Sequence, residues 1–572
     1  MPHSDIGLPS RLSQGLRGAL VLAALASSVP LQHARADSAS RPDAEAVRHS
    51  ASRIEADVRF LADDLLEGRE AGTRGYDLAA LYVATQYRMM GLEPAGDAGT
   101  YFQTVPMLSA RRVAEVARFS LTRDGQTTEL QFKDEFLPGL DFNGGACELT
   151  APMVFVGQGV HAPELKHDDF AGVDLRGKVA VILANAPARF SNDQRAYHSD
   201  GILKLGEIER RGAVGVIFLG DPESESKYPW SFGADNWQRP GMRILGPDGK
   251  PLETHPGLRC MARVPASKAP LLLAGARYTP AQVFARKEKG TLRPFELKGT
   301  VTLASRSKLE PVTSRNVVGK VPAGASSDGD AAASRAGEHI LLTAHLDHVG
   351  TGAAVNGDSI YNGAQDNAVG TAAMLEAGRL LMQSRDSMQR SVLLLATTAE
   401  EKGLLGADYF AANPTVPLAS IVANVNLDMP TYLAPVTDLI PYGIEHSTLD
   451  TVAKTAVEAA GLTLTPDPFP DEVVFVRSDQ YSFIRKGVPA VYLGAGITRA
   501  DGSDGLAAFG AFLRQHYHKP SDDLSQPIDW NGAARLAIVN RNIAYAIATQ
   551  ETRPEWKPGD FFGDRFGAQK AR

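Results

Sequence analysis

Four near-continuous apolar runs in the C-terminal half of the sequence constrain its fold most strongly. They are HILLTA, SVLLLATT, ASIVANVNLD and VPAVYLGAG, which begin at residues 339, 391, 419 and 488. Strands that are apolar throughout are typical of a sheet covered on both faces. Helical patterns alternate with these runs, in TAAMLEAGRLLMQ, LDTVAKTAVEAAG and AARLAIVNRNIAYAIATQ. The alternation predicts an α/β domain with a mainly parallel, mixed sheet flanked by helices.

The rest of the chain divides into regions of different character. At 572 residues it exceeds what one hydrophobic core usually supports. Apolar residues at helical spacing predict two amphipathic helices between Ala44 and Leu92, joined by the turn-rich connector EGREAGTRG. Short β-like runs (MVFVGQGV, KVAVILAN, AVGVIFLG) and a predicted helix at 203–211 then indicate a separate β-rich domain, which we call the inserted region. The predicted division is a signal peptide at 1–36, a first part of the α/β domain at 37–143, the inserted region at 144–299, the rest of the α/β domain at 300–552 and a C-terminal tail at 553–572.

The N-terminal residues have the pattern of an export signal. Arg11 and Arg17 precede the apolar stretch GALVLAALASSVPL, and Ala34-Arg35-Ala36 fits a cleavage site. The apolar stretch, about 14 residues, is shorter than the roughly 20 that a membrane-spanning helix needs. We therefore expect a periplasmic or extracellular protein without a stable membrane anchor. In such a compartment Cys147 and Cys260 are either one disulfide or two buried thiols.

Charge and composition exclude some classes of partner. Apolar residues make up 44% of the chain and charged residues 22%, values close to those of ordinary globular domains. The net charge is -7, and no block of Lys and Arg is present. Nucleic acid and anionic membranes are therefore not expected as main partners.

Acidic and imidazole side chains follow the predicted strands. Parallel strands present their carboxyl ends at one edge of a sheet, where ligands of α/β proteins bind. The sequence places these side chains there: His345, Asp347, Asp366, Glu400, Glu401, Asp428, Tyr517 and His518. Taken singly, each has an ordinary explanation, such as a helix cap for Asp366 or a solvated turn for Glu400 and Glu401. Together they do not, because several converging carboxylates repel one another unless cations lie between them.

The residue types indicate which cations would bind between these carboxylates. Two imidazoles and three carboxylates form a nitrogen and oxygen ligand set that suits zinc. One carboxylate can bridge two ions, which then activate a single water for hydrolysis. Of the adjacent glutamates, one can bind metal while the other acts on the water as general base.

These motifs, in this order, resemble the secreted di-zinc aminopeptidase family that includes bacterial leucyl aminopeptidase and, more distantly, glutamate carboxypeptidase. The resemblance rests on AHLDHVG, YNGAQDNAVG, TAEEKGLLGA, NVNLDM, RSDQYSF and HYHKPSDD. The segments FLADDLLEGREAGTRG and RMMGLEPAG are similar to the family's N-terminal part, and VFVGQGVHAPELKHDDFAGVDLRGKVAVIL and GAVGVIFL to its protease-associated domain. The implied fold is that of the zinc exopeptidases, a phosphorylase/hydrolase-like α/β fold, with an inserted protease-associated domain.

The resemblance also implies roles for individual residues. Asp366 would bridge two zinc ions, Glu401 and His518 would complete one metal site, and His345 and Asp428 the other. Glu400 would be the general base that acts on the metal-bridging water. Asp347 would orient His345 through its free ring N–H. Tyr517 would stabilise the oxyanion. Gln365 and Gln480 differ from the residues that many relatives have, which concerns substrate preference rather than metal binding.

The implied function is a zinc-dependent aminopeptidase that acts on peptides with a free N-terminus. Related scaffolds also serve carboxypeptidase or dipeptidase cleavage and glutaminyl cyclisation, and these remain alternatives. Carboxypeptidase cleavage needs a basic residue that grips the substrate carboxylate, for which Arg477 is a candidate. A non-catalytic binding protein is a third alternative. The inserted region is either a spacer or a part that shapes access to the site.

Overall fold

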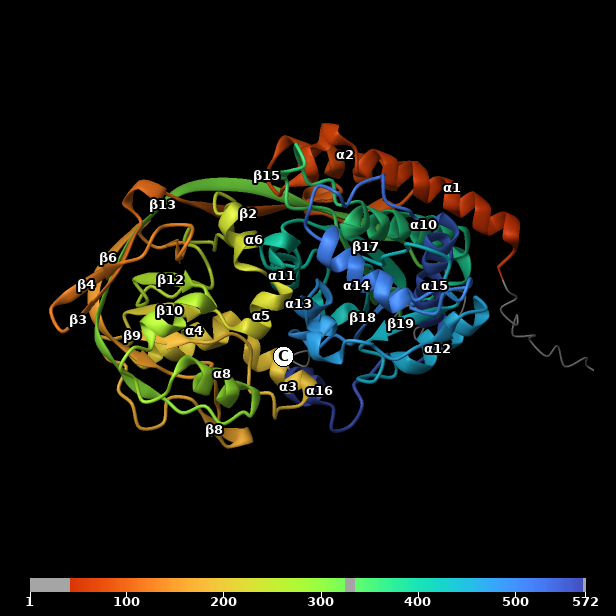
Figure 1. Cartoon of the computed structure of the whole chain (residues 1–572). Coiled ribbons are helices and arrows are strands. Elements are labelled where there is room, and N and C mark those ends of the chain that lie inside the picture. The colour runs from red at the N-terminus through yellow and green to blue at the C-terminus, as the bar shows by residue number, and fades with distance from the viewer. Residues whose placement is uncertain (1–41, 325–334, 569–572) are drawn as a thin grey trace, which may run out of the picture. The chain divides into compact units, whose positions relative to one another are not determined.

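The four apolar runs form neighbouring parallel strands in the computed structural model, which describes residues 42–324 and 335–568 (Figure 1). They are β14 (His339–His345), β17 (Ser391–Thr397), β18 (Ile421–Asn426) and β21 (Ala490–Ala495). β14 pairs with β17 on one side and with β18 on the other, and β18 pairs with β21. The predicted strands are confirmed. The predicted signal peptide lies outside the described residues.

Antiparallel strands extend this sheet at both edges. The end of β13 (Phe295–Val321) pairs with β17, and β19 (Asp438–Tyr442) pairs with β21. The mainly parallel, mixed sheet of the prediction is therefore confirmed. From β14 the chain continues to β17 on one side of β14. From β18, which lies on the other side of β14, it continues outward to β21. The carboxyl ends of β14 and β18 thus flank a switch in strand order, where α/β folds place their ligands.

Helices cover both faces of the sheet, because successive strand side chains point to opposite sides. Leu342 packs into the core beneath one layer of helices, and its neighbour Leu341 packs into the core beneath the other. The first layer holds α1 (Ala44–Leu61), α2 (Arg74–Met90), α10 (Val369–Gln383), α12 (Leu449–Ala459) and α15 (Trp530–Thr549). The second holds α11 (Leu405–Ala412) and α13 (Gln480–Ile484). All the helices predicted from periodicity in this region are present.

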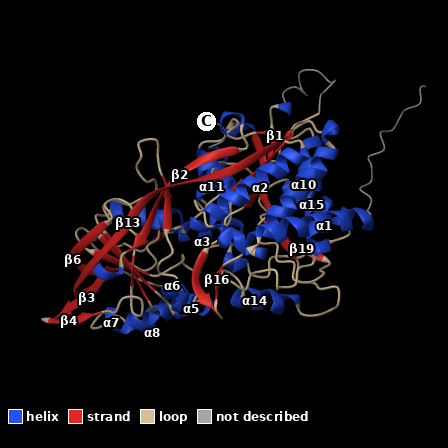
Figure 2. Ribbon diagram, turned by 90° about the horizontal axis from the view of Figure 1, so that it is seen from above, coloured by secondary structure: helices blue, strands red, loops and turns tan. Residues whose placement is uncertain are grey.

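The 27-residue strand β13 joins this sheet to the strands of the inserted region, as Figure 2 shows. Its first half pairs with β3 (Arg118–Arg123) and β6 (Ala146–Phe155), and its second half pairs with β2 (Phe102–Arg112). Sequence reasoning did not predict this strand, since Gly299 and Pro311 within it look like breaks. The domain boundary predicted at 299/300 falls inside β13 and stays a prediction.

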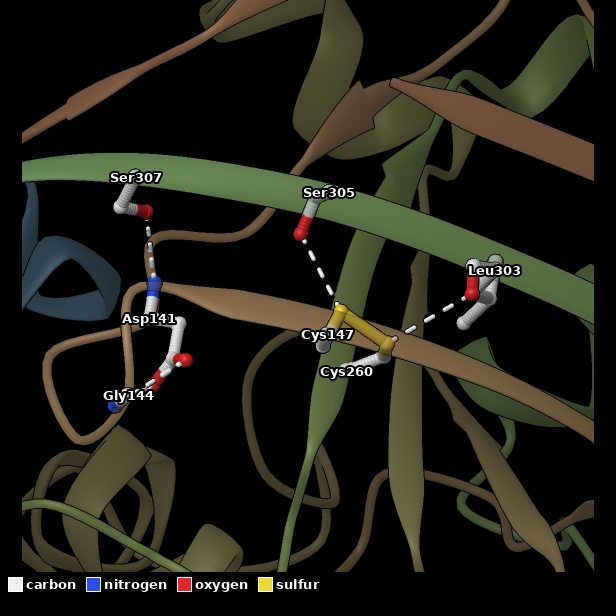
Figure 3. The surroundings of a disulfide bond; sticks show 7 residues. All are labelled: Asp141, Gly144, Cys147, Cys260, Leu303, Ser305 and Ser307. Carbon is white, nitrogen blue, oxygen red and sulfur yellow. Dashed lines mark hydrogen bonds between the residues drawn. A yellow bond between two sulfur atoms is a disulfide. The ribbon is translucent and has the colours of Figure 1, made fainter. Parts of the chain in front are cut away.

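Within the inserted region, β6 begins a run of parallel strands that continues with β9 (Val179–Ile182), β10 (Gly215–Leu219) and β12 (Cys260–Val264). The predicted helix is α4 (Gly201–Arg210), whose first N–H groups are capped by the Asp200 carboxylate. A disulfide between Cys147 and Cys260 links β6 to β12 (Figure 3). The structure therefore decides between the two states that the sequence left open for these cysteines.

Shorter elements complete the described part of the chain. The helices are α3 (Asn192–Ser199), α5 (Pro222–Lys227), α6 (Trp230–Asp235), α7 (Ala269–Leu272), α8 (Pro280–Glu288), α14 (Gly505–Gln515) and α16 (Phe561–Phe566). The strands are β1 (Glu93–Pro94), β4 (Gln126–Glu129), β5 (Leu137–Pro138), β7 (His161–Ala162), β8 (His167–Asp168), β11 (Gly241–Ile244), β15 (Thr351–Val355), β16 (Asp358–Ile360) and β20 (Thr463–Leu464). Among the described helices, none combines the length and apolar character needed to cross a membrane.

Candidate metal centre

The carboxyl edge of the parallel sheet gathers the side chains that the sequence singled out. His345 is the last residue of β14, Asp428 follows β18, and Glu400 and Glu401 follow β17. Asp366 lies in the loop before α10, and His518 follows α14. The structure brings all five predicted metal ligands into two adjoining clusters that share Asp366.

The first cluster joins the two strands at the switch in strand order. Nε2 of His345 lies 2.9 Å from Oδ1 of Asp428 and 3.3 Å from Oδ1 of Asp366. His345 and Asp366 are buried, and Asp428 is partly exposed. One imidazole and two carboxylates therefore face a common point.

The second cluster uses the other oxygen of Asp366. Nε2 of His518 lies 3.1 Å from Oδ2 of Asp366 and 3.2 Å from Oε2 of Glu401. His348 also belongs to this cluster, with Nδ1 2.8 Å from Oε1 of Glu401. Sequence reasoning noticed His348 beside His345 but did not count it as a site residue. The sequence signal for including His348 was its position just after the end of β14.

The donor set of these clusters fits a divalent metal. Within the described residues, both ring nitrogens of His348 and Oε1 of Glu401 are buried without a hydrogen-bond partner. Nδ1 and Oε1 approach closely but lack the alignment of a hydrogen bond. Side chains that converge without bonding to one another are expected where a cation accepts their lone pairs. Imidazole nitrogen and carboxylate oxygen are ligands that zinc prefers.

The electrostatics of the metal-free site also favour a cation. Burial lowers the pKa of His518, but Glu401 and Asp366 beside it outweigh burial and raise its pKa to about 10. Burial raises the pKa of Glu400 well above its usual range, and the charges of Glu401 and Asp428 raise it further. Protons thus hold the clusters together when metal is absent, and metal binding must displace them.

Asp347 contacts His345 through its main chain and the two glutamates through its side chain. Nδ1 of His345 lies 3.0 Å from the main-chain carbonyl oxygen of Asp347, not from its carboxylate. The carboxylate instead accepts hydrogen bonds from the N–H groups of Glu400 (3.0 Å) and Glu401 (3.4 Å). The carbonyl contact leaves the carboxylate free to hold the turn that carries both glutamates, and the predicted orienting role of Asp347 stays a prediction.

Asp522 has the same role on another loop, and sequence reasoning missed it. Its two carboxylate oxygens accept hydrogen bonds from the N–H groups of Gln365 (2.9 Å) and Asp366 (3.1 Å). Its place in HKPSDD, shortly after His518, was the only sequence signal. Two buried aspartates thus each fix a pair of successive N–H groups in a ligand-bearing loop.

Glu400 and Tyr517 belong to neither cluster but lie beside them. The charge of Glu400 acts on His345, and the charges of His345 and Asp428 act on Glu400. The ring of Tyr517 stacks on His518 with centroids 3.9 Å apart. Burial raises the pKa of Tyr517, and Asp366 and Glu401 raise it further, so its hydroxyl keeps its proton at neutral pH.

The two glutamines that differ from many relatives are both buried. Gln480 accepts a hydrogen bond from Asn426 (2.7 Å) and donates one to the carbonyl of Phe475 (2.9 Å). The side-chain amide of Gln365 has no hydrogen-bond partner among the described residues. The side-chain amide of Gln480 is thus used in hydrogen bonds within the protein, while the amide atoms of Gln365 are not.

The fold and these clusters define an α/β protein with a candidate metal centre at the switch in strand order. Residues 316–544, which contain all the residues of both clusters, match Peptidase family M28. We call this matched segment the peptidase region.

Individual relatives match shorter stretches or the fold alone. An 86-residue segment is 33% identical to a vacuolar membrane protease of Pyricularia oryzae, covering 15% of this chain and 8% of that protein. A 218-residue segment is 28% identical to aminopeptidase Y of Saccharomyces cerevisiae, covering 37% of this chain and 36% of that protein. The matched segments thus span 8% of the length of the first relative and 36% of the length of the second. The solved aminopeptidase from Aneurinibacillus sp. strain AM-1 has the same fold, with a TM-score of 0.52 and 18% identity over 90% of this chain and 96% of that one.

Proposed function

We propose that this chain is an exported, zinc-dependent aminopeptidase that removes N-terminal residues from peptides. The observation that carries the proposal is the pair of clusters that share Asp366, with Glu400 beside them but in neither. The match of residues 316–544 to Peptidase family M28 and the names of the matched aminopeptidases support it. His345, Asp366 and Asp428 would hold one zinc ion, and Asp366, Glu401 and His518, with His348 beside them, the other.

The side chains then divide the work of hydrolysis. When bound, zinc supplies Lewis-acid polarisation of the scissile carbonyl and makes water easier to deprotonate. Glu400 accepts the proton from the water whose oxygen bonds to the carbonyl carbon. It then delivers this proton to the leaving amine as the C–N bond breaks, which returns the carboxylate. The Tyr517 hydroxyl donates a hydrogen bond to the oxygen that becomes negative.

A substrate panel with and without a chelator tests this proposal. Peptides with a free amino group, the same peptides with a blocked N-terminus, the same peptides with a blocked C-terminus, and dipeptides distinguish the possible activities. An aminopeptidase cleaves the free-amino and C-blocked peptides, spares the N-blocked ones, and loses activity with the chelator until zinc is restored. Cleavage of N-blocked peptides, or full activity in metal-free protein, would contradict the proposal.

The carboxypeptidase alternative loses support from the contacts of Arg477. This residue already pairs with Glu472 (3.1 Å) and donates a hydrogen bond to the Tyr228 hydroxyl (3.0 Å). A guanidinium that is paired in this way is less available to a substrate carboxylate. Glutaminyl cyclisation is expected to use one metal, so two zinc ions per chain would disfavour it. A non-catalytic protein would hydrolyse no peptide of the panel with zinc supplied.

We also propose that the inserted region shapes access to the site. The ring of Phe232, from α6, stacks on His518 with centroids 6.4 Å apart. Close to it, Asn236 accepts a hydrogen bond from the N–H of Ala353 (3.4 Å), and Arg239 lies over the ring of Tyr361 (4.2 Å). If Phe232 limits the entry, Phe232→Ala should cleave long peptides better relative to short ones. An unchanged ratio would make the region a spacer.

A further inference from the structure

The connector EGREAGTRG, which sequence reasoning treated only as turn-rich, lies directly against the candidate metal centre. Its first residues end the short helical turn Asp64–Arg69, where Glu67, Gly68 and Arg69 all have positive φ (51°, 69° and 52°). Gly68 is required here, because a Cβ on it would lie 2.4 Å from the carbonyl oxygen of Gly350. The turn therefore presses the main chain against the loop that follows β14.

Main-chain hydrogen bonds fix this approach. The N–H of His348 donates to the carbonyl of Arg69 (3.2 Å), and the N–H of Gly350 donates to the carbonyl of Gly68 (3.0 Å). The next residue, Glu70, binds Lys402 (2.7 Å), which directly follows Glu401. The segment Gly68–Glu70 thus contacts the loops that carry His348 and Glu401.

The Arg69 side chain connects two of the site loops to each other. It is 1% exposed. Its Nε donates to the carbonyl of Leu346 (2.9 Å), which follows His345. Its Nη1 and Nη2 donate to the carbonyls of Asn362 (2.6 Å) and Gly363 (3.1 Å), in the loop that leads to Asp366. One guanidinium therefore spans the loops that carry His345 and Asp366, and Nη1 also reaches the carbonyl of Leu61 in α1.

The charge of Arg69 faces the aspartates that hold the other site turns. Burial lowers the pKa of Arg69 to about 10, while Asp347 and Asp522 oppose that change, so Arg69 remains charged at neutral pH. No side-chain carboxylate bonds to its nitrogen atoms within the described residues; all its acceptors are main-chain carbonyls. The rigid planar fork of arginine suits this arrangement, and the single ammonium of lysine cannot reproduce it.

We propose that Arg69 is a positioning residue for the metal centre: it sets the spacing between the loop after β14 and the loop before Asp366, so that His345 and Asp366 reach the same ion. This inference rests on the metal centre of the proposed function. It predicts that replacing Arg69 lowers the metal affinity more than replacing another buried arginine that is equally important for stability. Changes to residues that orient metal ligands commonly lower metal affinity by about 10- to 100-fold.

Arg390 supplies the matched control. It is also 1% exposed, donates to the carbonyls of Ile547 (2.8 Å) and Glu551 (3.0 Å), and pairs with Glu338 (2.6 Å). It precedes β17 at Ser391, so it lies at the strand end opposite to the one that carries Glu400 and Glu401. A purely structural role for Arg69 would make the two arginines equivalent.

The experiment measures zinc affinity of the metal-stripped full chain, by competition with a chromophoric chelator, alongside thermal unfolding. We expect Arg69→Lys to lower zinc affinity about 10- to 100-fold, and Arg390→Lys to lower the unfolding temperature while changing zinc affinity less than about twofold. Arg69→Gln, which keeps two amide hydrogens for the same carbonyls, replaces the lysine variant if that variant does not fold.

Three results would overturn the proposal. They are a folded Arg69 variant with wild-type zinc affinity, an Arg390 variant with an equal loss of affinity, and failure of both Arg69 variants to fold while Arg390→Lys folds. A wild-type chain that binds no zinc would instead refute the metal centre of the proposed function.

Discussion

The inserted region and the peptidase region both bury charged groups, but they balance them differently. In the inserted region, buried Lys287 pairs with buried Asp221 (2.8 Å) and also reaches Glu223 (2.9 Å). At the sheet edge, Asp366, Glu401 and Asp428 face imidazoles, and no Lys or Arg among the described residues pairs with them. A buried charge that is paired with an opposite charge stabilises the fold. Converging carboxylates whose only partners are imidazoles are instead suited to bind a cation.

The largest effect should follow from removing the base at the sheet edge. Glu400→Gln should lower kcat by about 10²- to 10⁴-fold, because proton transfer from water and to the leaving amine is lost. Zinc content and unfolding temperature should stay close to wild type, since Glu400 belongs to neither cluster. Single-turnover kinetics measure the loss in the chemical step, metal analysis measures the zinc content, and thermal unfolding measures the stability. Retained activity in the zinc-loaded variant would remove Glu400 from its proposed role.

Breaking the buried pair of the inserted region should instead reduce stability. Lys287→Met leaves Asp221 buried without its counter-charge, which typically costs about 3–5 kcal/mol. Chemical denaturation measures the loss. The control is Lys178→Met, because Lys178 pairs with half-exposed Glu296 (2.7 Å) and such surface pairs contribute at most about 1 kcal/mol. If Lys287→Met lowered zinc affinity in the folded protein, the contrast between the two regions would fail.

The hydroxyl of Tyr517 should matter to chemistry but not to folding. Tyr517→Phe should lower kcat by about 10²- to 10³-fold, as loss of one oxyanion donor does elsewhere. The stacked ring over His518 remains in this variant, so zinc affinity should be preserved. The discriminating measurement is kcat against KM. A change in KM alone would assign the ring to substrate packing.

The disulfide should stabilise only the inserted region. Replacing both Cys147 and Cys260 by serine should cost about 2–5 kcal/mol in the free energy of unfolding. The sequence has no other cysteine, so mild reduction of the wild type should give the same loss. The kcat of the folded variant on a short peptide should be unchanged. A loss of kcat in fully folded protein would show that the inserted region acts in the chemistry itself.

A further effect concerns the protons held at the clusters. Since the pKa of His518 is raised to about 10 in the metal-free site, zinc must displace its proton at neutral pH. Apparent zinc affinity should therefore rise from pH 6 to pH 8, by about tenfold per pH unit for each proton released. Calorimetry in buffers of different ionisation enthalpy counts the protons, and His518→Ala should release about one fewer. An affinity independent of pH would contradict the protonated metal-free state.

One physical reason allowed the sequence to predict both the strands and the candidate site residues that the structure brings together. Strands buried on both faces are apolar throughout, so the polar residues after His345, Thr397 and Asn426 stand out at their ends. Sequence reasoning did not identify contacts that depend on loop conformation. One such contact is the hydrogen bond between His345 and the carbonyl of Asp347. Another is the pair of hydrogen bonds that Asp522 accepts from the loop at Asp366. Both depend on main-chain directions that residue types do not encode.

Two larger features were also beyond the sequence. The continuous strand β13 contains Gly299 and Pro311, and local propensity argues against a strand at both. At Pro311 the long pairing with β2 outweighs that preference, because non-local hydrogen bonds satisfy the surrounding main chain. Gly299 lies at a register shift in the pairing of β13 with β6, where a glycine is readily accommodated. The pairing of Cys147 with Cys260 depends on the neighbouring placement of β6 and β12, which are far apart in the sequence.

The continuity of β13 has a mechanical consequence. The strand enters the ladders of both regions, and β2 pairs with it without interruption from Ser307 to Val317. A bending motion along this crossing would have to break consecutive hydrogen bonds of a ladder, whereas a flexible linker would bend freely. Proteases that cut exposed, extended linkers should therefore find no cleavage site between residues 307 and 317. On this strand, the inserted region should therefore stay fixed relative to the sheet that carries the candidate metal centre.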